Sequence, residues 1–343
     1  MNEGNKQIKD SVALSAVVPC FNEEGSLGAL YSRLSVACQT NAEDDYEIVL
    51  VDDGSHDGTW PQMEDLARRD RHIVAVRLTR NHGHQLALSA GLEVCRGARI
   101  LIIDADLQDP PELLSEMMAL MDAGAHVVYG RRSERRGETW FKRVSAAAFY
   151  RVLRRLVDID IPLDTGDFRL MSRKALDLFR QMPEQHRFVR GMVAWIGLEQ
   201  VPLLYERDER FSGETKYPFK KMVRLGIDAV TGFSTKPLRI ASYLGFVFAL
   251  LALLGISYTL YSWFFFETVT GWASVMTVVL VLGSVQLLVL GVLGEYLGRM
   301  FMEAKRRPIF MIDKVVTSGL KEDSEASPTK TMRPVERPGW ELI

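Results

Sequence analysis

The sequence predicts an α/β domain with a mostly parallel sheet, followed by a hairpin of two membrane-spanning helices. Short apolar runs alternate with helical patterns up to residue 129, which is typical of parallel strands covered by helices on both faces. Residues 240–266 and 268–294 then contain no charged residue. Each stretch exceeds the roughly 20 residues that cross a bilayer core as a helix. A buried helical hairpin of a soluble protein is the alternative.

The elements of the α/β domain follow from these runs. Continuous apolar runs predict strands over residues 14–18, 47–51, 73–78, 100–103 and 127–129. Helical periodicity predicts helices near residues 24–39, 59–69 and 85–95, and from residue 111.

Composition and charge exclude some classes of protein. The 343 residues are enough for one large domain with an appendage. A formal net charge of −2 argues against a general nucleic-acid binder. Cys20, Cys38 and Cys95 lack metal-ligand spacing, so we expect buried thiols in a reducing compartment. Residues 1–13 show no apolar signal region, which predicts that the domain stays in the cytoplasm.

Basic residues outside the two apolar stretches predict the membrane topology. Lys236 and Arg239 precede the first stretch, and Arg299 and residues 305–307 follow the second. Positive charge favours the cytoplasmic side. We therefore expect an inner (plasma) membrane protein with two spans, cytoplasmic termini, and a loop near Glu267 on the outside.

The hydropathy pattern divides the chain into four parts. We expect a cytoplasmic α/β domain over residues 1–213, an interfacial amphipathic helix in 214–237, the hairpin in 238–297, and a basic segment with a disordered tail in 298–343. The amphipathic segment also fits an ordinary helix packed against a core.

Polar clusters follow three predicted strands. These are the turn at 19–24, Asp52-Asp53-Gly54-Ser55, and Asp104-Ala-Asp106. Parallel strands bring their carboxyl ends to one edge of a sheet, where α/β proteins bind ligands. Asp106 and Gln108 are hard oxygen ligands suited to Mg²⁺ or Mn²⁺. The alternative is a solvated turn that caps a helix at Pro110. No Gly-x-Gly-x-x-Gly or Walker pattern follows the first strand.

Five ordered motifs resemble family 2 glycosyltransferases of the GT-A fold, which is Rossmann-like. The resemblance is strongest to the membrane-anchored branch that acts on polyprenyl phosphates, and it covers roughly residues 14–310. The motifs lie at residues 17–24, 51–55, 80–83, 104–112 and 164–170.

This resemblance implies roles for individual residues. It implies that the nucleotide sugar contacts Pro19, Asn22, Glu23, Asp52, Asp53, Asn81 and Asp104. It implies that Asp106 and Gln108 hold Mg²⁺ or Mn²⁺, and that Asp104 and Asp167 act at the reacting centre. Asp52 as a turn former and Asp167 as a structural residue are the alternatives.

A polyprenyl phosphate needs cations near the membrane surface. Arg131, Arg143 and Lys216 are candidates as a group, and the resemblance adds Arg169. A solvated basic face that touches lipid headgroups is the alternative. Because the acceptor phosphate is already ionised, we expect positioning and charge neutralisation to outweigh general base catalysis.

The resemblance implies inverting transfer of a hexose from a nucleotide sugar to undecaprenyl or another polyprenyl phosphate. Glucose from UDP-glucose is the first choice. Alternative donors are GDP-mannose, a UDP-N-acetylhexosamine and a UDP-aminoarabinose derivative. An inactive membrane scaffold or transport-complex subunit is the alternative of another class. A processive polysaccharide synthase is disfavoured because two spans cannot enclose a polymer. Gly291, Gly294 and Gly298 permit close helix packing, so a homo-oligomer is possible.

Overall fold

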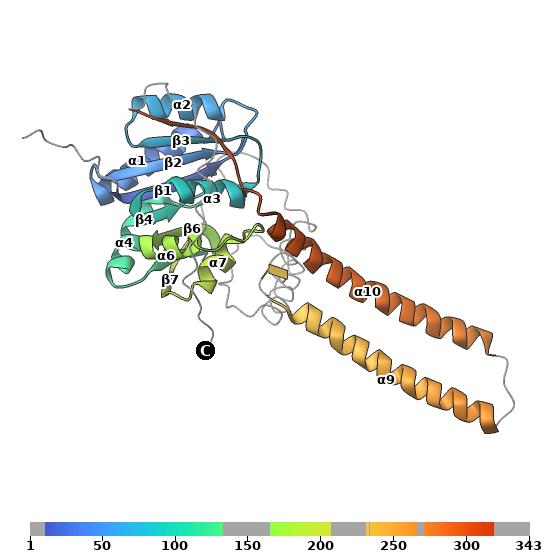
Figure 1. The fold of residues 1–343 in the computed structure, drawn as a ribbon. Helices are drawn as coiled ribbons and strands as arrows, with labels where there is room; N and C mark the ends of the chain where they lie inside the picture. Colours follow the sequence, from blue (N-terminus) through green and yellow to red (C-terminus); the bar gives the residue numbers. More distant parts are fainter. Residues whose placement is uncertain (1–10, 133–164, 207–230, 233, 266–270, 319–343) are drawn as a thin grey trace, which may run out of the picture. The chain divides into compact units, whose positions relative to one another are not determined.

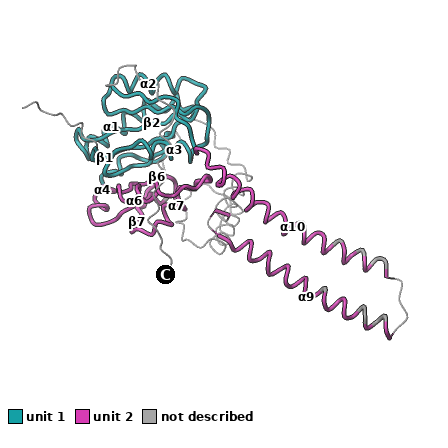
Figure 2. The backbone as a smooth tube through the Cα atoms, viewed as in Figure 1, with its two compact units in different colours: residues 1–115, 310–343 teal, residues 116–309 magenta. Residues whose placement is uncertain are grey.

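The computed structural model describes residues 11–132, 165–206, 231–232, 234–265 and 271–318 (Figure 1). The chain forms two compact units (Figure 2). Unit 1 contains residues 1–115 and 310–343, and unit 2 contains residues 116–309.

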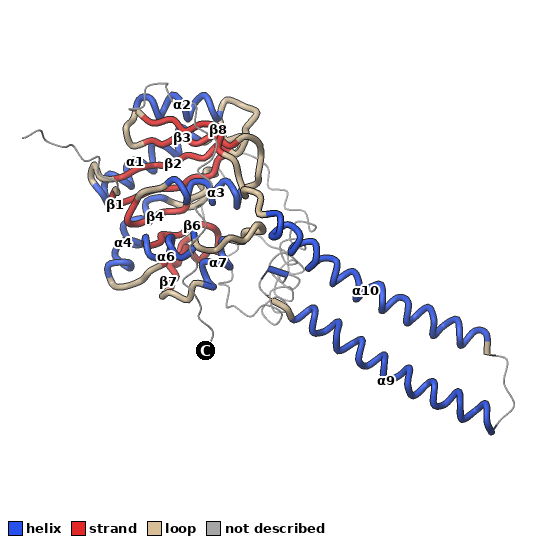
Figure 3. Tube along the Cα trace, in the orientation of Figure 1, coloured by secondary structure: helices blue, strands red, loops and turns tan. Residues whose placement is uncertain are grey.

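Unit 1 is a sheet with helices packed against it (Figure 3). Its strands lie in the order β4-β1-β2-β3-β8. β1 is parallel to β2 and β4, and β2 is parallel to β3. The strands are Val12–Cys20 (β1), Tyr46–Asp52 (β2), Ile73–Leu78 (β3), Gly97–Ile102 (β4) and Ile312–Thr317 (β8). The helices are Leu27–Ala42 (α1), Thr59–Arg69 (α2) and His84–Val94 (α3), with a 3-10 turn at Pro111–Leu113 (η1).

Burial explains why these segments adopt these structures. Every residue of β2 is buried, as expected of a central strand covered on both faces. In α2, Thr59, Trp60, Met63 and Ala67 are buried at helical spacing. The three cysteines are free and buried, as predicted. The predicted α/β class with a mostly parallel sheet is confirmed.

The described residues of unit 2 include three further strands and a hairpin of two long helices. β5 pairs with β7 in parallel and with β6 in antiparallel orientation. The strands are Val127–Arg132 (β5), Thr165–Ser172 (β6) and Gln200–Tyr205 (β7). The shorter helices are Leu114–Asp122 (α4, which begins in unit 1), Arg173–Arg180 (α6) and Val189–Trp195 (α7).

The hairpin consists of α9 (Lys236–Phe265) and α10 (Trp272–Lys305), which lie side by side (Figure 1). Both are long and apolar enough to cross a membrane. Large apolar side chains such as Phe246 and Leu287 are more than 70% exposed, which favours lipid as their surroundings. The second helix runs beyond the predicted span, which ended at residue 294. Its last turns carry charged residues that a hydropathy criterion excludes, although they continue the helix.

Three of the observed strands, β6, β7 and β8, were not predicted. β8 follows the second membrane helix and pairs with β3 in antiparallel orientation. Lys314 Nζ, on β8, donates to Glu64 Oε1 of α2 at 2.7 Å. Most of the predicted interfacial segment and the tail after residue 318 lie outside the described residues.

Candidate active site

The Asp52 carboxylate lies at the carboxyl end of β2 and is fully buried. Its Oδ1 accepts a hydrogen bond from the Ser55 backbone N at 3.0 Å. Its Oδ2 accepts no hydrogen bond from the described residues, and Arg77 Nε lies 3.9 Å away. A buried carboxylate oxygen without a donor is costly unless a ligand supplies one. Asp52 is therefore suited to accept an N–H or O–H from a ligand.

Asp53 holds the neighbouring turn in place. Its two carboxylate oxygens accept the backbone N–H groups of His82, at 2.7 Å, and Gly83, at 2.9 Å. Burial raises the pKa of Asp53, and these two hydrogen bonds oppose that rise. Burial and the charge of Arg80 lower the pKa of His82. This geometry gives Asp53 a structural role, and its contact with the nucleotide stays a prediction.

Gly54 allows the two motifs to meet. Its φ of +71° lies in the left-handed region, and a Cβ there would sit 2.7 Å from Asn81 N. Only glycine fits such a close backbone approach without a shift. The segments at 51–55 and 80–83, predicted to contribute to one site, are therefore in contact. Asn81 itself is exposed.

The turn after β1 interlocks with the turn after β2. Pro19 and Cys20 are the last two residues of β1, and both are buried. Asn22 donates its backbone N–H to Ser55 Oγ at 3.0 Å and accepts the His56 N–H at 2.9 Å. Glu23 donates its backbone N–H to Thr59 Oγ1 at 2.8 Å. These contacts fix the shape of the edge; whether these residues touch the nucleotide stays a prediction.

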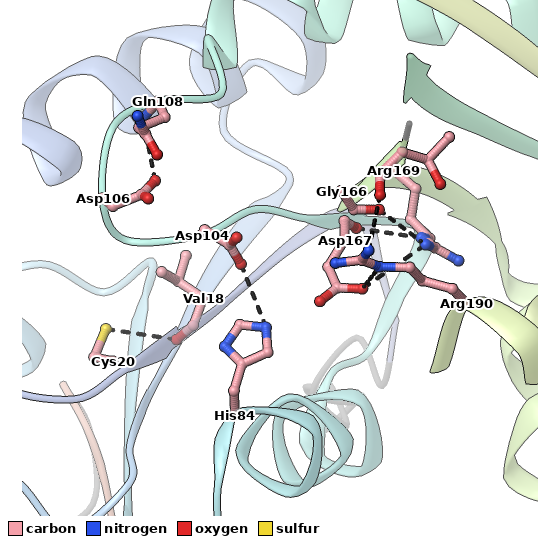
Figure 4. Close-up of polar contacts among 11 residues, drawn as sticks. Val18, Cys20, His84, Asp104, Asp106, Gln108, Gly166, Asp167, Arg169 and Arg190 are labelled. Atoms are coloured by element: carbon pink, nitrogen blue, oxygen red, sulfur yellow. Dashed lines mark hydrogen bonds and ion pairs between the residues drawn. The ribbon is translucent and has the colours of Figure 1, made fainter. Parts of the chain in front are cut away.

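The turn after β4 carries the predicted cation ligands (Figure 4). Asp106 Oδ1 accepts the Gln108 backbone N–H at 3.2 Å. Between them Leu107 is buried with a φ of +59°, an uncommon conformation for a residue with a branched side chain. Asp104 Oδ1 lies 3.5 Å from His84 Nε2, at the start of α3. The ligand atoms of Asp104 and His84 are close enough to share a metal ion.

In unit 2, Asp167 of β6 lies in an ionic cluster (Figure 4). Its Oδ1 accepts a hydrogen bond from Arg190 Nε at 2.8 Å, and Arg169 Nη2 lies 3.9 Å away. Arg190 Nη1 also donates to the Thr165 carbonyl at 2.8 Å. Asp167 is 2% exposed and Arg169 3% exposed, so both charges depend on such partners.

The structure describes Arg131 and Arg169, two of the four residues predicted to bind the acceptor phosphate. Arg131, on β5, is exposed. The Arg169 guanidinium donates to the carbonyls of Gly166 and Asp167, at 3.2 Å each, so its burial gives the phosphate assignment no support. Arg143 and Lys216 lie outside the described residues. Their roles stay predictions.

Sequence reasoning missed Arg190 and His84. Arg190 is the only charged residue in the apolar segment Val189–Trp195, and a charge in such a segment needs a partner. That signal points to a carboxylate elsewhere. His84 directly follows the motif at 80–83, but nothing in the sequence indicates its partner.

Comparison with known proteins identifies the class. Residues 15–179 match a family model described as glycosyl transferase family 2, and residues 236–300 match one described as GtrB C-terminal hairpin. The fold, the polar edge and these matches define a membrane-associated glycosyltransferase. The chain belongs to glycosyltransferase family 2, with the GT-A-type mostly parallel sheet predicted above.

Two curated relatives are similar over most of their lengths. An uncharacterized glycosyltransferase, YkcC of Bacillus subtilis, is 45% identical over 88% of this chain and 94% of its own. A prophage bactoprenol glucosyl transferase homolog of Escherichia coli is 38% identical over 88% of this chain and 99% of its own. Among solved structures, glucosyl-3-phosphoglycerate synthase from Mycobacterium tuberculosis, in complex with Mn²⁺, UDP-glucose and phosphoglyceric acid, matches with a TM-score of 0.42 and 20% identity. That match covers 64% of this chain and 78% of the synthase.

Proposed function

We propose that this enzyme transfers a hexose from a nucleotide sugar to a polyprenyl phosphate at the cytoplasmic face of the membrane, with inversion at the anomeric carbon. Undecaprenyl phosphate is the proposed acceptor, and UDP-glucose is the first choice of donor. The geometric observation on which the proposal chiefly rests is the Asp52 carboxylate, buried at the polar edge with one oxygen available to a ligand. The similarity to a bactoprenol glucosyl transferase homolog, which extends through the hairpin, supports the lipid acceptor.

We assign binding of the donor to the polar edge of unit 1. Asp52 Oδ2 would accept a hydrogen bond from the base or ribose of the nucleotide. Asp53 holds the turn of His82 and Gly83, whose backbone position depends on both of its oxygens. The interlocked turns after β1 and β2 keep this surface rigid, which lowers the entropy cost of binding.

The turn after β4 fits a divalent cation by its donor chemistry. Asp104 and Asp106 offer carboxylate oxygens, which Mg²⁺ and Mn²⁺ prefer, and Gln108 offers an amide oxygen. The hydrogen bond from the Gln108 backbone orients the Asp106 carboxylate. When bound, the cation would act as a Lewis acid on the diphosphate leaving group. The imidazole of His84, beside Asp104, would help to orient that carboxylate.

In this proposal Asp167 takes part in transfer to the acceptor. Arg190 and Arg169 hold its carboxylate in place, which suits stabilisation of positive charge at the anomeric carbon. The group Arg131, Arg143 and Lys216 is proposed to hold the acceptor phosphate. An exposed Arg131 agrees with contact to a ligand that arrives from the membrane surface.

A donor panel tests the proposal. The full chain, purified in detergent, is incubated with undecaprenyl phosphate, Mg²⁺ or Mn²⁺, and radiolabelled UDP-glucose, GDP-mannose, UDP-N-acetylglucosamine or a UDP-aminoarabinose derivative. We expect label in an organic-soluble, acid-labile product with one donor, and a β-linkage by NMR. Lack of labelled lipid with every donor, while the wild type binds UDP, would reject the acceptor assignment. Turnover of any donor would reject the inactive scaffold.

A further inference from the structure

The cytoplasmic end of the second membrane helix is hydrogen-bonded to the loop between α6 and α7. Gln185 in this loop donates its backbone N–H to Glu303 Oε1 at 2.7 Å. Its side-chain Nε2 donates to the Arg307 carbonyl oxygen at 2.8 Å. Both contacts lie within unit 2. They are well-formed hydrogen bonds, and the one to Glu303 is charge-assisted.

The helix end presents these two acceptors because of how it terminates. α10 ends at Lys305, and Arg306 adopts a left-handed conformation with φ of +48°. This turn directs the chain away from the helix axis and leaves the Arg307 carbonyl outside the helical ladder. The Gln185 side chain therefore donates to the Arg307 carbonyl, which lies just beyond α10. The Gln185 backbone N–H donates to the side chain of Glu303, which lies in the last turn of α10.

The loop that carries Gln185 leads to the Asp167 cluster. Arg187 Nη2 donates to the Met182 carbonyl at 2.8 Å, and its guanidinium lies 5.0 Å from the Phe179 ring centroid. These contacts brace the loop across its length. Arg190 follows in the first turn of α7 and binds Asp167. A displacement of Gln185 would therefore be transmitted to Arg190 through a short, braced segment.

We propose that the hydrogen bond between Gln185 and Glu303 acts as a latch, which holds the Asp167–Arg190 pair at a fixed distance from the end of the membrane helix. This distance determines whether a phosphate carried on a membrane lipid can approach Asp167. The inference rests on the proposed function. The acceptor phosphate is tethered to a chain in the bilayer, so its approach to the reacting centre depends on where the membrane helix ends. The nucleotide sugar arrives from solution and does not depend on that distance. Misplacement by about 1 Å can cost about 100-fold in rate.

The test separates the two substrates. Glu303→Ala removes the acceptor of the Gln185 N–H, whereas Glu303→Gln retains an oxygen in its place. Gln185→Glu cannot donate to the Arg307 carbonyl and brings a carboxylate towards Glu303. Gln185→Ala is a milder variant should Gln185→Glu fail to fold. Gln181→Ala is the matched control, because Gln181 Nε2 donates to the carbonyl oxygen of Asp177 in the preceding turn of α6, at 3.2 Å.

We expect Glu303→Ala and Gln185→Glu to raise the KM for undecaprenyl phosphate about tenfold, equivalent to about 1.4 kcal/mol. The KM for the donor should stay unchanged, and Glu303→Gln and Gln181→Ala should resemble the wild type. With a short prenyl phosphate dissolved in water, the defect should shrink. An unchanged lipid KM, an equal rise for both substrates, or a Glu303→Gln variant as impaired as alanine would overturn the latch. A wild type that transfers no sugar to lipid would instead refute the proposed function.

Discussion

Replacing Arg190 by methionine should lower the free energy of unfolding of unit 2. The contacts of Arg190 allow the size of this loss to be estimated. The substitution removes the 2.8 Å contact to Asp167, whose side chain is only 3% exposed. Breaking a fully buried ion pair by removing one partner costs about 3–5 kcal/mol. Arg190 is 31% exposed and Arg169 remains 3.9 Å from Asp167, so solvent and the second arginine reduce this cost. We expect a loss of about 2 kcal/mol.

Thermal unfolding of the full chain in detergent measures this loss. A destabilisation of about 2 kcal/mol corresponds to a decrease in Tm of about 4–8 °C for a unit of this size. Arg190→Lys should recover part of the Tm, because the charge remains while the second hydrogen bond, to the Thr165 carbonyl, is lost. The kcat of Arg190→Lys should still fall about 10- to 100-fold, because lysine holds Asp167 less firmly in the position that transfer requires.

A double-mutant cycle with Asp167→Asn isolates the pair. If the two side chains interact as described, Arg190→Met should destabilise an Asp167→Asn background much less than it destabilises the wild type. A coupling free energy near zero, or an Arg190→Met variant with the wild-type Tm, would refute the reasoning. Such a result would mean that Asp167 is stabilised by its other contacts alone.

Three further variants test other parts of the molecule. Asp52→Asn keeps the acceptor for the Ser55 N–H but removes the charge, so UDP affinity measured by calorimetry should fall about 10- to 100-fold; an unchanged affinity contradicts the donor site. Asp106→Asn should abolish divalent-dependent transfer without lowering the Tm, and retained turnover in Mg²⁺ and Mn²⁺ would exclude it as a ligand. Lys314 lowers the pKa of Glu64 below its ordinary 4.5 by a hydrogen bond. The Lys314–Glu64 pair therefore contributes its full stabilisation above about pH 4.5, and this contribution is lost as the pH falls through the lowered pKa of Glu64. Lys314→Met should cost about 0.2–1 kcal/mol in urea unfolding at neutral pH, and a difference that persists in acid would contradict this.

Labelling tests the topology. The native cysteines are buried, so they should add little background. A membrane-impermeant maleimide should label Thr270→Cys in intact cells and should leave Phe310→Cys unlabelled until the cells are opened. The opposite pattern would place the catalytic domain on the outer side.

The elements of unit 1 could be predicted because their sequence signals are local. The helix at Thr59–Arg69 and the strand at Ile73–Leu78 were predicted with their observed bounds, since continuous apolar runs and helical spacing mark buried faces directly. β8 could not be predicted in this way. It is six residues long and largely exposed, and it becomes a strand through its partner β3, which lies far away in the sequence.

The position of the candidate carboxylates at strand ends was predictable, but their contacts were not. Asp52 is the last residue of β2, and Asp104 and Asp106 follow β4, as their positions in the sequence indicate. The sequence does not show that both carboxylate oxygens of Asp53 accept hydrogen bonds from the backbone N–H groups of His82 and Gly83. Neither does it show that Arg190 partners Asp167, because a guanidinium and a carboxylate 23 residues apart carry no mutual pattern.

The position of β8 has a consequence for how the protein is made. During synthesis, the strands from β1 to β4 leave the ribosome before either membrane helix, whereas β8 is translated only after both. Until then β3 is an open edge strand, and open edges invite pairing with other chains. The hairpin is therefore synthesised before β8 can close this edge of the sheet. A chain that stalls in the membrane, or one cut after α10, would keep β3 as an uncapped edge strand that is open to pairing with other chains.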